Sequence, residues 1–97
     1  MVPIVKSPQY ERDVIEIWQH IAQLNPDAAD YVVTAIEGAI ELLGQFPRLG
    51  TPCPHLAPDL RRVLWREYLV YYRLRHDRVE IVRALHGRRN IGSSQFE

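Results

Sequence analysis

The apolar residues of this chain change their spacing once along the sequence, and that change most restricts the folds open to it. Between residues 8 and 46 they recur every three or four positions, the spacing of one helix face. From residue 60 onward, β-branched and aromatic residues form runs typical of strands. The intervening segment, residues 47–59, contains four prolines, which exclude a continuous helix and predict a loop.

Two helices are predicted in the first region. Residues 7–8 (Ser-Pro) and 25–26 (Asn-Pro) each place a capping side chain before a proline. Proline is well tolerated at the first helical position, because the N–H that it lacks has no partner there anyway. The two signals predict helices at 8–24 and 26–46, joined by a tight turn as an antiparallel hairpin. The polar residues of the first helix, Asp13 among them, are assigned to the face opposite the apolar stripe.

The remaining segments predict a sheet. Residues 2–6 form a short β-branched run whose proline suits an edge strand, and residues 60–86 contain three runs separated by short turns. We therefore predict one α+β domain over residues 1–97, because so short a chain cannot build two adequate cores. The expected order is β-α-α-β-β-β, with the helical hairpin packed on one face of a small, mostly antiparallel four-stranded sheet. Residues 87–97 are expected to form a tail.

The charge is divided unevenly along the chain, although the net charge is zero. Residues 1–60 carry three basic and eight acidic side chains, a net of −5, whereas residues 61–97 carry nine arginines and four acids, a net of +5. Eleven of the twelve basic residues are arginines, whose planar group pairs in bidentate fashion with carboxylates or phosphates. The second half of the chain is therefore expected to recognise an anionic partner.

Composition excludes several other classes of protein. No segment approaches the roughly 20 consecutive apolar residues that a membrane helix needs, and the first ten residues lack the features of a signal peptide, so a cytoplasmic location is expected. Cys53 is the single cysteine, which excludes an internal disulfide. It has only His55 nearby as a second ligand, so neither a metal nor another cofactor is expected.

The segment order, together with particular residues, resembles the ParE branch of the RelE/ParE toxin superfamily, which includes plasmid stabilisation proteins. The matching landmarks are DVIEIWQHIAQLNPDAA (13–29), FPRLGTPCP (46–54), LRRV (60–63), YLVYYRL (68–74) and VEIVRALHGRRN (79–90). The resemblance implies a bacterial toxin that a ParD-like antitoxin holds inactive. Members of the ParE branch usually act on DNA gyrase, whereas members of the RelE branch cleave messenger RNA on the ribosome.

Three residues could supply a nuclease site if the chain were of the RelE kind. Arg62 and Arg83 resemble the phosphate-binding positions of those enzymes, and His86 is the obvious group for proton transfer. However, those nucleases usually carry a tyrosine in the C-terminal segment, where this chain has Phe96, and Lys6 is its only lysine. These departures favour a non-enzymatic inhibitor over a nuclease.

The residues expected to contact the target or the antitoxin form a basic set near the end of the chain. They are Arg61, Arg62, Arg73, Arg83, His86, Arg88 and Arg89. The leading hypothesis is a toxin that inhibits gyrase by binding it. The alternatives are a ribosome-dependent endoribonuclease and a non-toxic module that only binds an antitoxin. The antitoxin is expected to contribute an acidic, amphipathic C-terminal segment that places carboxylates on the arginines.

Overall fold

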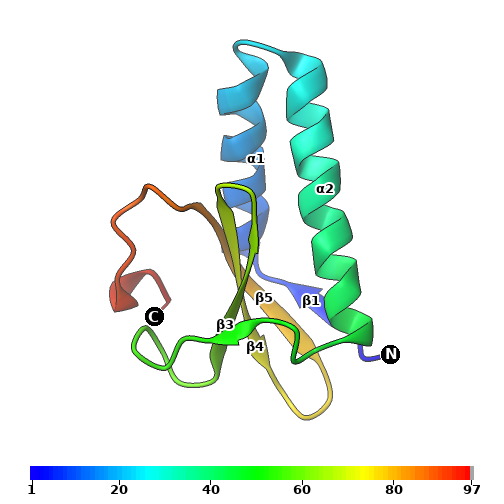
Figure 1. The fold of residues 1–97 in the computed structure, drawn as a ribbon, viewed down its shortest axis with the longest axis vertical. Coiled ribbons are helices and arrows are strands. Elements are labelled where there is room, and N and C mark those ends of the chain that lie inside the picture. Colours follow the sequence, from blue (N-terminus) through cyan, green and yellow to red (C-terminus); the bar gives the residue numbers. More distant parts are fainter. Residues whose placement is uncertain (97) are drawn as a thin grey trace.

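The structure is a computed structural model, and it describes residues 1–96. Its elements are β1 (Ile4–Lys6), α1 (Pro8–Ala22), α2 (Pro26–Gln45), β2 (Thr51–Pro52), β3 (Leu60–Trp65), β4 (Tyr68–Leu74), β5 (Val79–His86) and a 3-10 helix η1 (Ser93–Phe96). The two long helices form an antiparallel hairpin that stands against the sheet (Figure 1). The predicted α+β class and the helical hairpin are confirmed.

The sheet has five strands in the order β1-β5-β4-β3-β2, so the predicted count of four was wrong. The additional strand is β2, which lies inside the segment predicted to be a loop and pairs with β3 through Thr51 and Pro52. Proline is tolerated there because β2 is an edge strand, where no neighbour needs its missing N–H. Strand β1 pairs in parallel with β5, and the other neighbours are antiparallel.

The helices begin where the sequence predicts. The Ser7 hydroxyl accepts a hydrogen bond from the backbone N–H of Tyr10 at 3.0 Å, and the Asn25 side chain accepts one from Ala28 at 3.2 Å. The helices end one or two residues earlier than expected, at Ala22 and Gln45, and the first strand begins at Ile4 rather than residue 2. Within residues 1–96, no helix is long and apolar enough to cross a membrane.

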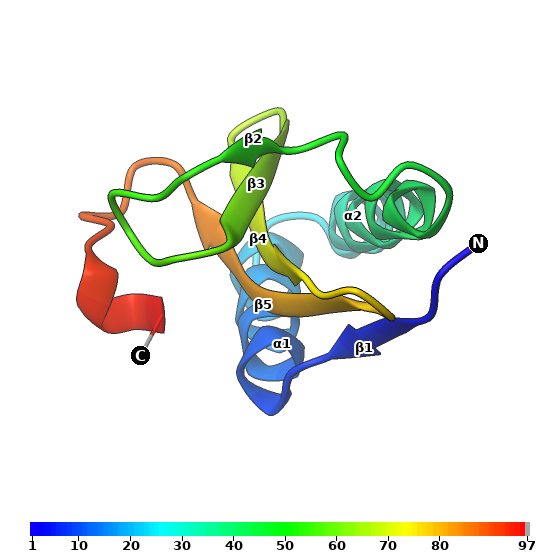
Figure 2. The same cartoon turned by 90° about the horizontal axis from the view of Figure 1, so that it is seen from below.

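Both faces of the sheet are covered by apolar residues, which gives two cores. The first core joins the helices to one face and includes Tyr10, Ile36, Ile40, Leu43, Val70, Tyr72 and Ile81. The second core lies on the opposite face and consists of Cys53, Ala57, Leu60, Tyr71, Leu85 and Phe96. The Pro-rich loop and the C-terminal tail supply its outer layer, so the tail and α2 lie on opposite sides of the sheet (Figure 2).

The loop after α2 is held against the sheet by Tyr72. Its buried hydroxyl accepts a hydrogen bond from the Gly50 N–H at 2.8 Å and donates one to the Pro47 carbonyl at 2.7 Å. A Cβ atom at Gly50 would lie 2.6 Å from Cε1 of Tyr72 and 2.8 Å from the carbonyl oxygen of Arg62. Only glycine therefore fits where the loop crosses the sheet.

We expect Gly50→Ala to lower the free energy of unfolding by about 2 kcal/mol, because the methyl group must displace the ring or the strand. Gly38→Ala is the matched control, since a Cβ there meets no atom within 4 Å. Gly38 lies inside α2, so its replacement should raise stability by about 0.5–1 kcal/mol. Urea denaturation of both variants measures the difference. Equal effects of the two substitutions would contradict this account of Gly50.

Candidate functional site

Three of the predicted site arginines project from the sheet face that points away from the helices. Arg62 on β3 and Arg83 on β5 both pair with Tyr71 of β4, and Arg73 lies two residues further along the same strand. The register of β5 shifts at this point, with Arg83 opposite Tyr71 and Ile81 opposite Tyr72. The shift brings Arg83 to the edge of the sheet beside α1, because β1 ends its pairing at Ile81.

Asp13 of α1 holds Arg83 in place. Its carboxylate accepts hydrogen bonds from Nε and Nη2 of Arg83 at 2.8 and 2.9 Å, from the N–H of Ala84 at 3.0 Å, and from the Gln9 side chain. Asp13 is only 2% exposed. Hydrogen bonding to this carboxylate raises the pKa of Arg83 further above its ordinary value, so the guanidinium stays charged. The pair joins α1 to the otherwise open edge of β5.

The C-terminal tail covers the same arginines. Arg73 donates to the carbonyl oxygen of Phe96 at 2.8 Å, and Nη1 of Arg83 lies 3.4 Å from the carbonyl oxygen of Gln95. The Phe96 ring is buried against Tyr71, with ring centroids 4.6 Å apart. A cavity of about 490 Å³ remains between the tail and α1, and Arg12 joins Arg73 and Arg83 in its wall. These arginines thus form a basic recess that the tail partly occupies.

Arg61 and Arg62 also have partners within the protein. Arg61 donates to the carbonyl oxygens of Gly50 at 2.7 Å and Arg48 at 3.3 Å, so it secures the loop after α2. Arg62 lies 3.4 Å from the hydroxyl of Tyr71. These two neighbours point to opposite faces of β3, because their partners on β4, Tyr72 and Tyr71, belong to different cores.

His86 lies at the end of β5, on the helix side of the sheet. Its Nδ1 accepts a hydrogen bond from the N–H of Arg88 at 3.0 Å, and its ring meets Tyr68 edge to face at 5.3 Å. Two cavities of about 210 and 410 Å³ adjoin here, and both are lined by His20, Tyr68 and His86. We call this surface the histidine groove.

The two tail arginines lie beside the histidine groove. Arg88 and Arg89 are exposed, and Arg89 lines the smaller of the two cavities. Neither makes a salt bridge within residues 1–96, so both guanidinium groups can pair with a partner's acids. Of the seven predicted contact residues, His86, Arg88 and Arg89 are brought together here.

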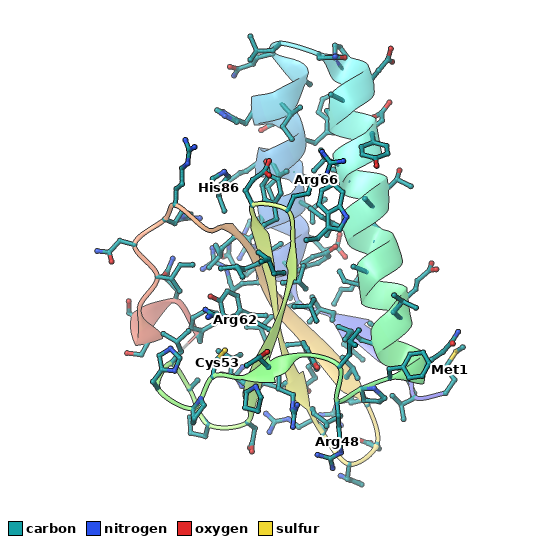
Figure 3. The ribbon with its side chains drawn as sticks, in the orientation of Figure 1. Met1, Arg48, Cys53, Arg62, Arg66 and His86 are labelled. Carbon is teal, nitrogen blue, oxygen red and sulfur yellow. The ribbon has the colours of Figure 1, made fainter. Side chains whose placement is uncertain are left out.

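The structure does not bring the three nuclease candidates together. Arg62 and Arg83 share one face of the sheet, whereas the His86 side chain belongs to the other, and Figure 3 places Arg62 and His86 at different levels of the molecule. The ion pair with Asp13 and the tail carbonyl already occupy most of the Arg83 guanidinium. Within residues 1–96, no cluster of three His, Cys, Asp or Glu side chains could hold a metal ion.

Comparison with known proteins identifies the family. A family model described as the ParE toxin of the type II toxin-antitoxin system parDE matches residues 4–91. The chain belongs to the ParE toxin family. It is 33% identical over 88 residues to toxin ParE1 of Caulobacter vibrioides, covering 89% of this chain and 90% of that protein. It is 29% identical to toxin ParE3 of the same organism, covering 93% of this chain and 91% of that toxin.

Solved structures show the same fold. A chain of the chromosomal ParDE toxin-antitoxin system from P. aeruginosa aligns with a TM-score of 0.78 and 22% identity, over 89% of this chain and 96% of that chain. A chain of the RelBE2 toxin-antitoxin complex from Mycobacterium tuberculosis aligns with a TM-score of 0.60 and 23% identity, over 88% and 96% of the two chains. The family match ends at residue 91, so η1 and its anchor Phe96 lie outside the matched residues.

Asp13 is the main residue of this site that the sequence-based prediction missed. It was assigned to the polar face of the first helix, yet it is buried among the contacts between α1 and β5. A signal was present, because Asp13 follows Tyr10 by three positions and precedes Ile17 by four, both on the apolar stripe. An acid at that spacing indicates a buried carboxylate that needs a cationic partner.

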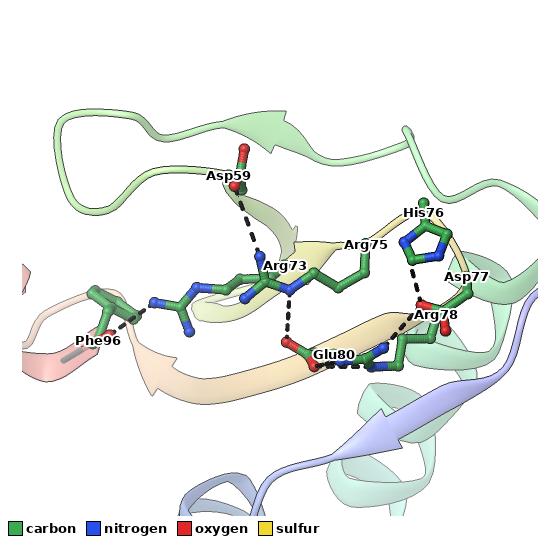
Figure 4. A network of polar contacts seen from close by, with 8 residues as sticks. All are labelled: Asp59, Arg73, Arg75, His76, Asp77, Arg78, Glu80 and Phe96. Atoms are coloured by element: carbon green, nitrogen blue, oxygen red, sulfur yellow. Dashed lines mark hydrogen bonds and ion pairs between the residues drawn. The ribbon is translucent and has the colours of Figure 1, made fainter.

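Two further arginines, Arg75 and Arg78, form a network with Glu80 (Figure 4). Glu80 accepts hydrogen bonds from Arg75 at 3.1 Å and from Arg78 at 3.0 Å. Burial alone would raise the pKa of Glu80, but the hydrogen bonds and charges of Arg78 and Arg75 outweigh it, so the pKa lies below its ordinary value. The ion pairs therefore stabilise the fold at pH values above the pKa that Glu80 has in the unfolded chain. This contribution is lost as the pH falls through the lower pKa that Glu80 has in the folded protein.

We expect Glu80→Gln to reduce the free energy of unfolding by about 0.5–1 kcal/mol at pH 7, since both arginines are well exposed and the solvent screens them. The difference from wild type should shrink as the pH falls through the lowered pKa of Glu80. Urea midpoints measured between pH 3 and 7 check this expectation. Glu41→Gln on the exposed side of α2 is the control. A Glu80→Gln deficit that does not depend on pH would contradict the ion-pair account.

Proposed function

We propose that this toxin inhibits DNA gyrase by direct binding, that a cognate ParD-like antitoxin neutralises it, and that it acts in the cytoplasm without catalysis. The family carries the assignment, because residues 4–91 match the ParE toxin model and the curated relatives with matching lengths are ParE toxins. The geometry supports an inhibitor, since Arg83, one of the two candidates for phosphate binding, is engaged by Asp13 and by the tail. An arginine with these partners has few donors left for a substrate.

The proposed contact residues divide into two groups. His86, Arg88 and Arg89 are the group available to a partner, because the two arginines are exposed beside the histidine groove. Arg61, Arg62, Arg73 and Arg83 contribute by shaping the second face and by fixing the tail and the loop. A charged pair at the rim of an interface mainly affects the association rate and its salt dependence.

The decisive experiment is a supercoiling assay with purified protein freed of antitoxin. Inhibition of gyrase without degradation of added RNA is the expected result. Replacing both Arg88 and Arg89 with glutamate should weaken inhibition by about tenfold or more, because the reversed charges repel an acidic surface. Arg12→Glu, also an exposed arginine, is the matched control. Folded protein that leaves gyrase fully active would refute the gyrase assignment.

The same preparation separates the two alternatives. Cleaved message in a translating extract, lost in Arg83→Ala and His86→Ala, would assign the chain to the ribosome-dependent nucleases. Normal bacterial growth despite soluble expression of the chain without its antitoxin would show a non-toxic module. Circular dichroism of the Arg83→Ala protein must accompany the extract assay, because that variant loses a buried ion pair.

A further inference from the structure

A second groove lies at the opposite end of the molecule from the histidine groove. A cavity of about 590 Å³ is bounded by Phe46 and Leu49 of the loop after α2 and by Leu74 at the end of β4. A second cavity of about 390 Å³ adjoins it along the Pro-rich loop. The two cavities share Arg48 and Leu74 in their walls, and we call the pair of neighbouring cavities the Arg48 groove. Arg48 marks it at the lower edge of the molecule in Figure 3.

The apolar residues at the mouth of the Arg48 groove are held outward by the backbone. Helix α2 ends at Gln45, Phe46 leaves the helical conformation, and the Leu49 N–H closes a turn onto the Phe46 carbonyl at 3.0 Å. Phe46 is 58% exposed and Leu49 is 56% exposed. The Tyr72 hydroxyl fixes both sides of this turn, so the two side chains are presented without the entropy cost of ordering a loop.

The charge of the Arg48 groove is positive. Its walls carry Arg48, Arg61 and Arg75 and one acid, Asp59. Arg75 pairs with Glu80 at 3.1 Å and lies 3.8 Å from Asp59, whereas the Arg48 side chain has no acid within 4 Å among residues 1–96. An exposed apolar surface flanked by an unpaired arginine has the composition of a protein-binding site.

We propose that the Arg48 groove binds an acidic, extended segment of the antitoxin. One bulky apolar side chain of that segment inserts between Phe46 and Leu49, and a carboxylate next to it pairs with Arg48. The cavity volume suits one or two such side chains, and the neighbouring cavity continues the path for the flanking residues. The inference rests on the proposed function, because it needs an antitoxin, and it adds a contact surface distant from His86, Arg88 and Arg89.

The test is a titration of the full-length toxin with the full-length antitoxin encoded by the neighbouring reading frame. Leu49→Asp and Arg48→Glu should each raise the dissociation constant by about tenfold or more, and Arg48→Glu should also reduce its dependence on salt. Both positions are exposed, and melting curves confirm that the variants fold. The matched controls are Leu64→Asp, at a site 68% exposed on β3, and Arg66→Glu, at an exposed position outside the groove, which should change affinity less than about twofold.

The outcomes distinguish the groove from the proposed function. If both groove variants bind the antitoxin as tightly as the wild type does, the inference about the Arg48 groove is overturned, while the proposed neutralisation by an antitoxin stands. If the groove variants still bind the antitoxin but no longer inhibit gyrase, the groove binds the target instead. That result would also overturn the inference that the groove binds the antitoxin. Failure of the wild-type chain to bind the antitoxin at all would overturn the proposed neutralisation and the groove together.

Discussion

Asp13→Asn should lower the free energy of unfolding by about 3–4 kcal/mol, because it leaves a buried charge without its partner. The amide has nearly the shape of the carboxylate but carries no charge, and it turns a donor toward the donors of Arg83 and Ala84. Arg83 would then remain charged at a site where its side chain is only 13% exposed. A buried charge that loses its partner costs far more than an exposed pair contributes.

Urea denaturation measures this loss, and a double-mutant cycle assigns it. Glu16→Gln, on the exposed side of α1, should change stability by less than about 0.5 kcal/mol. Replacing Asp13 with Asn and Arg83 with Met together should cost less than the sum of the single effects, by about 1.5 kcal/mol or more, because the uncompensated charge is then absent. Additive effects would show that the two side chains act independently and would contradict the ion-pair account.

Phe96→Ala should lower the free energy of unfolding by about 3 kcal/mol, a typical cost of removing a buried phenylalanine. Phe96 is 4% exposed and is the last residue of η1, so its ring anchors the tail to Tyr71 and the second core. Without the anchor, the carbonyl groups of Gln95 and Phe96 should leave Arg83 and Arg73, and the basic recess should open.

Hydrogen exchange separates loss of the tail from global weakening. The Gln95 N–H, which donates to the Gly92 carbonyl at 3.2 Å, should exchange much faster in Phe96→Ala than in wild type, while the Val79 N–H, which donates to the Pro3 carbonyl at 2.9 Å, stays protected. Ser94→Ala, at an exposed position of the same 3-10 helix, is the control and should leave both rates unchanged. A Phe96→Ala protein with wild-type stability and a protected Gln95 N–H would show that the tail docks without its phenyl ring.

Part of the candidate site could be predicted from the sequence. The predicted set contained His86, Arg88 and Arg89, which do lie together, because they are close in the chain and leave the same strand end. It also contained Arg61, Arg73 and Arg83, which bind other parts of the protein. The sequence alone does not distinguish an exposed arginine from one that donates a hydrogen bond to a carbonyl group of a distant segment. Their difference depends on which segments the fold brings together.

By itself, the sequence determined the type of most elements and the residues at which the two helices begin, because the responsible signals are local. Ser7 and Asn25 cap helices through contacts within three residues, and the alternation along 68–74 sets which tyrosine faces which core. Only the tertiary structure decided the parallel pairing of β1 with β5, the fifth strand β2 and the ion pair between Asp13 and Arg83, which are 70 residues apart. These features depend on backbone and side-chain groups finding partners across the fold, and no local pattern specifies which partner each group finds.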